Sequence, residues 1–381
     1  MSTASTTVTD KPNITTTQPI WSPNTIMQIL FVNFGLFFQS TCIVFTQLFS
    51  LLLYPFSYKL YRQFISYTMR MWSQNLIALV ELFAPSEYVL TFDKSCGPVQ
   101  DILQSDDSNH VMGLHLPERM IIIANHQIYA DWIYIWGIAH LAGAHGAVKI
   151  ILKKSLEYLP IYGTGMKFFD FIFLKRKLAF DKDNIINNLQ RSKRHHLPMW
   201  LVLFPEGTVI SDCTRKKSKE YAEKNNMKDN RYTLLPRSTG LRLCTAVLED
   251  SIEYVYDFTI GYSGIKPNEI PENVFTIQSI FFFNQYPKQI HIHVRRYRVD
   301  SIPYHNEQEF SQWTFDRWAE KDQLMDTFYR TGSFDDNSVT VPIKLKTSIV
   351  ELAQIWIFMV PYLFLLKFST QLKYAICNLF K

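Results

Sequence analysis

The sequence has few cysteines, and they form no recognisable pattern. There are five among 381 residues, an odd number, and no two have the C-x-x-C spacing of zinc sites or redox motifs. This excludes a disulfide framework and a cysteine-based zinc site. It is typical of a main domain that faces a reducing compartment. The cysteines are Cys42, Cys96, Cys213, Cys244 and Cys377.

Charge is also scarce. Charged residues make up 19% of the chain, whereas apolar residues make up 47% and aromatic residues 15%. This composition excludes a disordered or collagen-like chain and indicates more apolar surface than a soluble domain needs. The net charge of +5 is too small for a dedicated nucleic-acid-binding protein, so no nucleic-acid partner is expected. It is compatible with anionic lipids or phosphorylated ligands.

The longest stretch without charge lies near the N-terminus. No Asp, Glu, Lys, Arg or His occurs between Pro12 and Tyr58, and residues 26–56 are dense in Leu, Phe, Ile and Val. A spanning helix needs about 20 apolar residues, so this longer run predicts a membrane helix that is tilted, or broken near residues 39–41. It is not a cleaved signal peptide, because the start of the chain lacks a basic region and the apolar part is too long.

The charges around this run predict its orientation. Three basic residues follow it, Lys59, Arg62 and Arg70, whereas only Lys11 precedes it. By the positive-inside rule, the chain after the run is cytosolic and the polar tail, residues 1–24, lies on the other side. A second helical stretch at residues 67–83 has some polar positions and is expected to lie at the interface or against the first. Residues 25–85 are thus expected to anchor a membrane-embedded protein as a helix or helix pair.

The rest of the chain predicts an α/β domain at residues 86–335. Short aliphatic or β-branched runs alternate with helical or loop-length intervals, which is typical of a central, mostly buried sheet flanked by helices. These runs are residues 88–92, 120–124, 149–152, 200–204 and 254–260. Residues 289–299 alternate apolar and polar side chains and predict a later strand with one solvent-facing side. Residues 307–330 predict a charged amphipathic helix.

The C-terminal segment, residues 336–381, contains a second apolar stretch at residues 349–366. This stretch is long enough to span a membrane, but Glu351 and Pro361 interrupt it. Lysines on both sides give it no orientation. A transmembrane helix and an apolar helix packed on the domain or lying at the interface are both compatible with the pattern.

The first candidate site is N-H-Q-I-Y-A-D, residues 125–131, directly after an apolar run. Ligand and catalytic residues of open α/β sheets collect beyond the carboxyl ends of strands. On one straight helix, His126 and Asp131 would be about 140° apart and could not meet. We therefore expect His126 in the loop and Asp131 at or inside the first turn of the next helix. Such a pair can act as a general base and its orienting carboxylate, although a helix cap is the common explanation of an isolated H-x4-D.

Two further segments follow apolar runs. The motif F-P-E-G-T occupies residues 204–208, where Pro ends the strand and Gly lets the backbone approach a ligand. Glu206 and Thr208 supply hydrogen-bonding groups. The segment F-I-F-L-K-R at residues 171–176 ends in Arg176, whose guanidinium suits bidentate contact with a phosphate, although a surface ion pair is the common alternative.

In this order and spacing, these segments resemble the membrane lysophospholipid acyltransferases of the 1-acylglycerol-3-phosphate acyltransferase family. That family carries N-H-x4-D, a segment like F-I-x-x-R, and F-P-E-G-T, and the resemblance covers residues 88–265. The block L-P-R-S-T-G-L at residues 235–241 is similar to the branch with lysocardiolipin and lysophosphatidylinositol acyltransferases, including fungal members. The chain departs from the family at Val209, where many relatives have Arg or another polar residue, and at residues 254–259, which lack a V-P pair.

The resemblance implies transfer of a fatty acyl group from acyl-CoA to the free hydroxyl of an anionic lysophospholipid, lysophosphatidylinositol or a similar lipid. It implies an enzyme of the endoplasmic reticulum membrane with a cytosolic catalytic domain. His126 would be the general base and Asp131 its partner. The acceptor's phosphate and glycerol would be held by Arg176, Glu206, Gly207 and Thr208. Because a thioester is already activated, this direct transfer needs no metal, cofactor or enzyme nucleophile, and acyl-CoA is a co-substrate.

Other functions remain open at this point. The acceptor could be lysophosphatidic acid, giving phosphatidic acid, or the enzyme could be a CoA-independent transacylase. A catalytically inactive lipid-binding protein of the same fold is disfavoured because His126, Asp131 and Glu206 are all present. The absence of a G-x-S-x-G motif argues against a serine hydrolase. His291 and His293 point the same way from a strand, but they lack a clear third ligand, so no metal site is expected.

Overall fold

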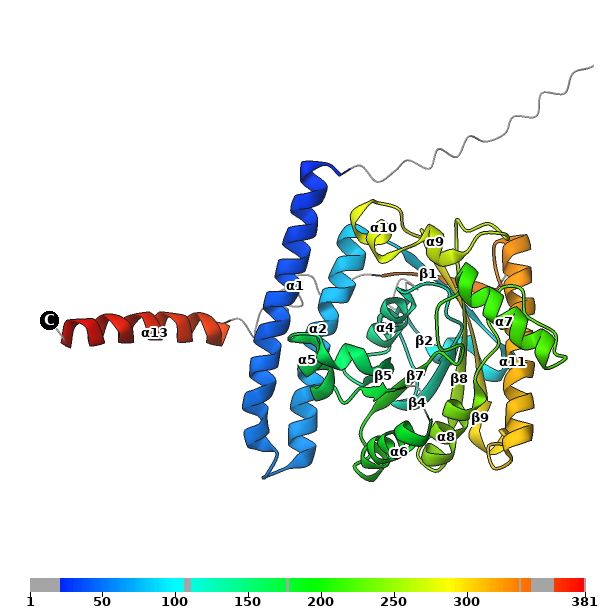
Figure 1. The fold of residues 1–381 in the computed structure, drawn as a ribbon, viewed down its shortest axis with the longest axis horizontal. Helices are drawn as coiled ribbons and strands as arrows, with labels where there is room; N and C mark the ends of the chain where they lie inside the picture. Colours follow the sequence, from blue (N-terminus) through cyan, green and yellow to red (C-terminus); the bar gives the residue numbers. More distant parts are fainter. Residues whose placement is uncertain (1–20, 106–110, 176–177, 336, 344–359, 380–381) are drawn as a thin grey trace, which may run out of the picture.

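A central sheet of eight strands organises the protein. The computed structural model describes residues 21–105, 111–175, 178–335, 337–343 and 360–379. The strand order is β10-β1-β9-β8-β4-β7-β5-β6, with helices on both faces (Figure 1), which confirms the predicted α/β class. The strands are β1 (Glu87–Phe92), β4 (Arg119–Ala124), β5 (Val148–Lys153), β6 (Ile172–Leu174), β7 (Met199–Leu203), β8 (Tyr254–Tyr262), β9 (Gln289–Arg298) and β10 (Ser338–Pro342). A separate pair is formed by β2 (Leu103–Ser105) and β3 (Val111–Leu114).

Along the chain, most helices connect one strand to the next. They are α1 (Pro23–Ser50), α2 (Tyr58–Phe83), α3 (Val99–Ile102), α4 (Asp131–Leu141), α5 (Tyr162–Phe168), α6 (Leu178–Arg194), α7 (Asp212–Lys224), α8 (Ser238–Leu248), α9 (Pro271–Val274), α10 (Ile277–Phe282), α11 (Glu307–Thr331) and α13 (Val360–Leu379). The strands β4, β5, β6, β7 and β8 are parallel to one another, so their carboxyl ends share one edge. β9 runs antiparallel to β8, and β1 is parallel to β9.

Each strand near the middle of the sheet is apolar on both faces because both faces are covered. On β4, Met120 and Ile122 pack with α2 and α4, whereas Ile121 and Ile123 pack with α6, α8 and α11. All four side chains are fully buried. Two covered faces explain why these strands read as continuous apolar runs in the sequence.

The first two helices pack side by side as an antiparallel hairpin at one side of the domain (Figure 1). Trp72 Nε1 donates to Ser40 Oγ at 3.1 Å, and Gln47 Nε2 donates to Thr68 Oγ1 at 3.0 Å. α1 continues without interruption through residues 39–41, so the break considered there does not occur. α2 begins well before residue 67 and buries one face in the core. It thus joins the hairpin to the domain.

Within the described residues, one helical segment, Pro23–Leu53, is long and apolar enough to cross a membrane. Large apolar side chains are exposed along it, including Phe31, Phe34 and Phe49. Its N-terminal end also contacts the domain. The Trp21 ring lies 5.6 Å from the Phe283 ring, and Gln28 Nε2 donates to the Phe281 carbonyl at 3.0 Å.

Two details differ from the sequence-based expectations. The prediction of a solvent-facing side on β9 is wrong, because Ile290 to Val294 are all buried. His291 and His293 face the rings of Phe328 and Phe334 instead, at 5.0 and 6.0 Å. The sheet also extends beyond residue 335, because β10 pairs with β1.

Of the apolar stretch at residues 349–366, the first part lies outside the described residues, and the last part begins α13.

Candidate active site

Two loops meet at the carboxyl edge of the sheet. β4 and β7 pair in parallel with Ile123 opposite Leu203, so the segments that follow them are neighbours. The first loop carries His126 and ends where α4 begins at Asp131. The second contains the F-P-E-G-T motif. The sheet thus brings the two motifs together although they lie about 80 residues apart in sequence.

The expected contact between His126 and Asp131 is present. His126 Nδ1 lies 2.8 Å from Asp131 Oδ2, with the histidine in the loop and the aspartate as the first residue of α4. Asp131 is fully buried, and Oδ2 also accepts from the backbone amides of Gln127 at 2.7 Å and Ile128 at 3.2 Å. These donors hold the carboxylate in place, and the carboxylate fixes the imidazole so that Nε2 remains for a substrate.

Tyr262, at the end of β8, supplies a further donor to Asp131. Its hydroxyl lies 2.5 Å from Asp131 Oδ1, and both side chains are buried. Burial and the adjacent carboxylate raise the pKa of Tyr262 well above its usual range. The phenol therefore stays protonated and donates to Asp131. Sequence analysis missed this residue, although its position at a strand's carboxyl end was a usable signal.

The second loop, which carries the F-P-E-G-T motif, also contacts His126. The His126 ring stacks on Phe204, with centroids 4.2 Å apart. The His126 carbonyl accepts from the Ile210 amide at 3.1 Å. The backbone amide of His126 donates to Glu206 Oε1 at 3.3 Å. The side chain of His126 is 16% exposed and lines a large cavity.

Glu206 supports these loops from behind. It is 3% exposed, and Oε1 also accepts from Trp318 Nε1 on α11 at 3.1 Å. Oε2 accepts from the Leu234 amide at 3.2 Å. Burial raises the pKa of Glu206 to about 7, while these donors favour the carboxylate. Both carboxylate oxygens accept hydrogen bonds from protein groups, one of them the amide of the cavity-lining His126, and a contact of Glu206 with the acceptor stays a prediction.

The other expected acceptor contacts have different positions. Gly207 and Thr208 line the cavity beside His126. Gly207 has φ +74°, a conformation that favours glycine. Arg176 lies outside the described residues. Arg237, from the L-P-R-S-T-G-L block, lines the same cavity next to Gly207. Among the described residues that line the cavity, Arg237 and Lys153 are the basic side chains with a permanent charge.

The cavity has a volume of about 1190 Å³ and is lined mainly by apolar side chains. Its walls come from the hairpin as well as from the sheet, since Ile43 and Val44 of α1 and Trp72 of α2 face it. His126, Lys153 and Arg237 lie at or just after strand ends, and the apolar walls extend to the hairpin. In the described part of the chain, no three His, Cys, Asp or Glu side chains gather as a metal site.

Comparisons with known proteins agree with this arrangement. Residues 109–263 match a family model described as acyltransferase, and residues 281–356 match one described as acyltransferase C-terminus. The 2-acyl-1-lysophosphatidylinositol acyltransferase of Saccharomyces cerevisiae is 37% identical over 76% of this chain and 82% of its own length. Lysocardiolipin acyltransferase 1 of Gallus gallus is 32% identical over 62% of this chain and 61% of its own. A probable 1-acyl-sn-glycerol-3-phosphate acyltransferase 5 of Arabidopsis thaliana is 33% identical over 61% and 60%.

These matches cover both motif-bearing loops and the strands that position them. The chain therefore belongs to the lysophospholipid acyltransferases of the 1-acylglycerol-3-phosphate acyltransferase family, in the branch that contains lysophosphatidylinositol and lysocardiolipin acyltransferases.

Proposed function

We propose that this protein transfers a fatty acyl group from acyl-CoA to the free hydroxyl of an anionic lysophospholipid. The observation that carries the proposal is the His126–Asp131 pair at 2.8 Å beside an apolar cavity of about 1190 Å³. His126 Nε2 removes the proton of the acceptor hydroxyl as its oxygen attacks the thioester carbonyl carbon. The carbon–sulfur bond then breaks, and the imidazolium returns the proton to the departing CoA thiolate.

The surrounding residues support this reaction. Asp131 holds Nδ1–H of the imidazole and stabilises the charge that develops when Nε2 is protonated. The apolar walls suit the acyl chains of donor and acceptor, because burying hydrocarbon from water is favourable. Direct attack on an activated thioester needs neither an enzyme nucleophile nor a cofactor.

For the acceptor we propose lysophosphatidylinositol or a similar anionic lysolipid. Arg237 and Lys153 supply positive charge on the described cavity wall, and Arg176 remains a proposed phosphate contact. Positive charge cannot distinguish inositol phosphate from a bare phosphate, so the headgroup follows from the Saccharomyces relative. The Arabidopsis relative makes lysophosphatidic acid the second candidate.

We further propose that the hairpin of α1 and α2 anchors the enzyme to the endoplasmic reticulum membrane with its catalytic domain in the cytosol. The exposed apolar side chains of α1 support membrane contact, and Lys59, Arg62 and Arg70 support a cytosolic domain.

The test is transfer in washed membranes from cells that overproduce the protein, with one labelled acyl-CoA and each lysolipid in turn. We expect transfer to lysophosphatidylinositol at least as fast as to lysophosphatidic acid, and no transfer without acyl-CoA. His126→Ala should remove nearly all of it, and Asp131→Asn should lower it by about three to four orders of magnitude, because the tautomer is wrong.

Normal transfer by an abundant His126→Ala protein would refute the mechanism. Transfer to lysophosphatidic acid with none to lysophosphatidylinositol would refute the headgroup assignment only. Transfer without acyl-CoA would indicate a transacylase.

A further inference from the structure

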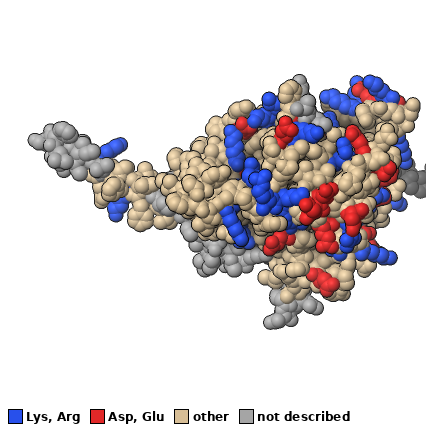
Figure 2. All heavy atoms as spheres, turned by 90° about the horizontal axis from the view of Figure 1, so that it is seen from below, with Lys and Arg blue, Asp and Glu red and all other residues tan. Residues whose placement is uncertain are grey.

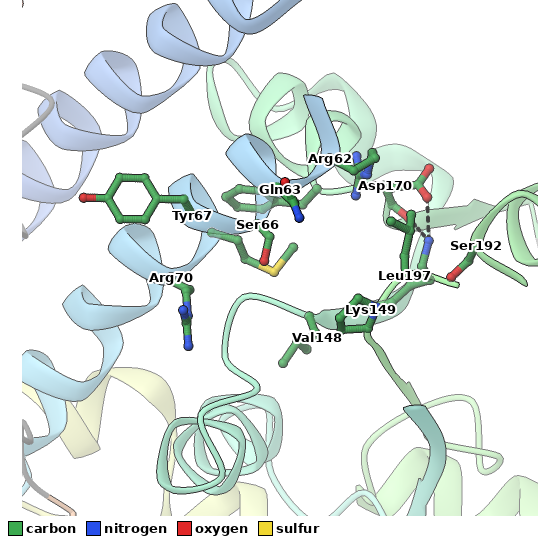
Figure 3. Close-up of a pocket in the computed structure, with 14 residues that line it drawn as sticks. Arg62, Gln63, Ser66, Tyr67, Arg70, Val148, Lys149, Asp170, Ser192 and Leu197 are labelled. Carbon is green, nitrogen blue, oxygen red and sulfur yellow. Dashed lines mark hydrogen bonds and ion pairs between the residues drawn. The ribbon is translucent and has the colours of Figure 1, made fainter. Parts of the chain in front are cut away.

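A second cavity lies at the opposite edge of the sheet from His126. It has a volume of about 330 Å³ and lies between α2 and the amino ends of β5 and β7. Figure 3 shows Ser66 and Arg70 of α2 on one side, Lys149 on the other, and Arg62 of α2 beside Asp170. The proposed reaction uses none of these residues.

The cavity wall, together with Arg191 directly behind it, holds an excess of positive charge. Lys149 Nζ lies 2.6 Å from Asp170 Oδ2, and Arg191 Nη2 lies 2.6 Å from Asp170 Oδ1. Arg62 also lies close enough to Asp170 to lower the pKa of this carboxyl group. Three cations thus share one carboxylate, which leaves an excess of two positive charges, and Lys149 is only 5% exposed. Arg70 adds a further cation to the lining. Charge of one sign that the protein leaves unbalanced around a cavity favours an anionic ligand.

The two arginines of α2 have donors to spare. Arg62 Nη1 donates to the Phe168 carbonyl at 2.9 Å, and Arg70 Nη2 donates to the Gly143 carbonyl at 3.0 Å. Arg62 Nε is buried and has no partner among the described residues. A guanidinium has five N–H groups, so these carbonyl contacts orient each group and leave other donors for a phosphate. Arg62 and Arg70 are about two helical turns apart on α2, and both line the same cavity.

The cavity also lies close to the end of the hairpin that we propose enters the membrane surface. Leu52 and Phe56, between α1 and α2, are 69% and 88% exposed. Tyr54, Tyr58 and Tyr61 follow as a cluster with ring centroids 5.4 to 6.1 Å apart. Tyrosines and cations behind an apolar tip are typical of the level of lipid headgroups.

The molecular surface at this end also passes from uncharged to basic residues. Figure 1 places the α1–α2 turn and α6 at the lower end of the molecule. Figure 2, seen from below, shows Lys and Arg gathered between the uncharged surface and an acidic region farther along. The last turn of α6 carries Arg191, Lys193 and Arg194.

We propose that this cavity is a second anion site, which takes the phosphate of an anionic phospholipid headgroup while the hairpin lies in the membrane surface. The site rests on the membrane part of the proposed function but not on the acyl-transfer mechanism. Arg62 and Arg70 provide the N–H donors. The positive charge around Asp170, from Lys149, Arg191 and Arg62, provides the electrostatic attraction for the phosphate. It lies at the amino ends of the strands, whereas the acceptor site lies at their carboxyl ends.

The experiment uses the full chain purified in detergent. Bound phosphatidylinositol is counted per chain by native mass spectrometry, and its affinity is measured by titration, with phosphatidylcholine as the zwitterionic lipid. We expect Arg62→Gln with Arg70→Gln to lose one bound phosphatidylinositol and at least tenfold in affinity at that site. Arg62→Lys with Arg70→Lys should keep part of the binding. Acyl transfer on the same preparations reports the proposed function separately.

A matched control is Lys219→Gln with Arg330→Gln, which removes two exposed cations from α7 and α11 and should change nothing. Arg70 is exposed, so Arg70→Gln alone tests the site if Arg62→Gln affects folding. Glycerol 3-phosphate that binds as tightly as phosphatidylinositol would support the anion site and assign it to a soluble phosphate. Unchanged phosphatidylinositol binding in the glutamine variants, or equal binding of phosphatidylcholine, would overturn the proposal.

Discussion

Asp131 is the residue on which the geometry of the site depends most. One oxygen accepts from the His126 ring and from two backbone amides, and the other accepts from Tyr262. A fully buried carboxylate is costly unless such donors satisfy it. Because the donors come from the loop after β4 and from β8, and Asp131 itself begins α4, the orientation of the imidazole depends on the assembled sheet.

We predict that Tyr262→Phe lowers kcat by about tenfold to a hundredfold and leaves both KM values nearly unchanged. The change removes one hydrogen bond to a buried carboxylate, worth about 1–3 kcal/mol, without removing the ring. The measurement is transfer kinetics over a range of pH, since a displaced imidazole also changes the pH profile.

Tyr134→Phe is the matched control, because Tyr134 is a buried tyrosine whose ring lies 5.7 Å from that of Tyr262. If the two variants have the same kcat and pH profile, Tyr262 is only a packing residue.

Arg237 gives a second prediction at this scale. If its guanidinium binds the acceptor phosphate, Arg237→Lys should raise the KM for lysolipid by about tenfold, because a point charge replaces a bidentate fork. The KM for acyl-CoA should hardly change. Arg298→Lys, on the exposed end of β9, is the control. A change confined to acyl-CoA would instead place Arg237 at the donor's phosphates.

At the scale of elements, α11 does more than its amphipathic pattern indicates. Trp318 reaches Glu206 behind the active site, and Phe328 covers His291 on β9. The same helix therefore supports the loop that carries Glu206 and covers one face of the sheet, and both depend on how α11 packs against the domain. Burial under this helix and under Phe334, which follows it, lowers the pKa of His291 and of His293 to about 4.

This burial predicts a loss of stability in acid. Both histidines stay neutral in the folded protein down to about pH 4, whereas in the unfolded chain they titrate near 6.5. The unfolded chain therefore binds more protons between these values, and stability falls as pH decreases from about 6.5 to 4. Each histidine contributes up to about 1.4 kcal/mol per pH unit.

Thermal unfolding midpoints of the detergent-solubilised protein across this range check the prediction. His291→Gln with His293→Gln should flatten the pH dependence, while the same change at the exposed His115 and His305 should not. An equally steep dependence in the first variant would contradict it.

At the scale of the whole molecule, both ends of α1 contact the catalytic domain. Gln28 binds α10 near one end, and Ile43 and Val44 line the active-site cavity near the other. A helix held in this way cannot place its N-terminus across a bilayer from the domain without leaving it. Of the two arrangements that the sequence leaves open, a spanning helix and a helix pair in one leaflet, we therefore propose the second.

We accordingly predict that protease digests two tags in sealed microsomes, one at the N-terminus and one after Phe92. The sequon at residues 13–15, which lies outside the described residues, should remain unglycosylated because it never enters the lumen. Protection of the N-terminal tag alone would show that α1 spans the membrane.

The sequence by itself determined the sheet class, most strands and the meeting of His126 with Asp131. These follow from local patterns, because apolar runs form buried strands and parallel strands deliver their following loops to one edge. The same local pattern identified α1 as an apolar helix. Each of these inferences needs only residues near one another in the chain.

Only the tertiary structure decided what covers each element. Glu206 is buried because Trp318, 112 residues away, closes over it, and Asp131 gains Tyr262 from 131 residues away. β9 looks half-exposed in sequence but is covered by α11, and α1 looks like a spanning helix but is held against the domain at both ends. Periodicity reports the chemistry of one segment, whereas burial depends on the distant segment that packs against it, which no local pattern specifies.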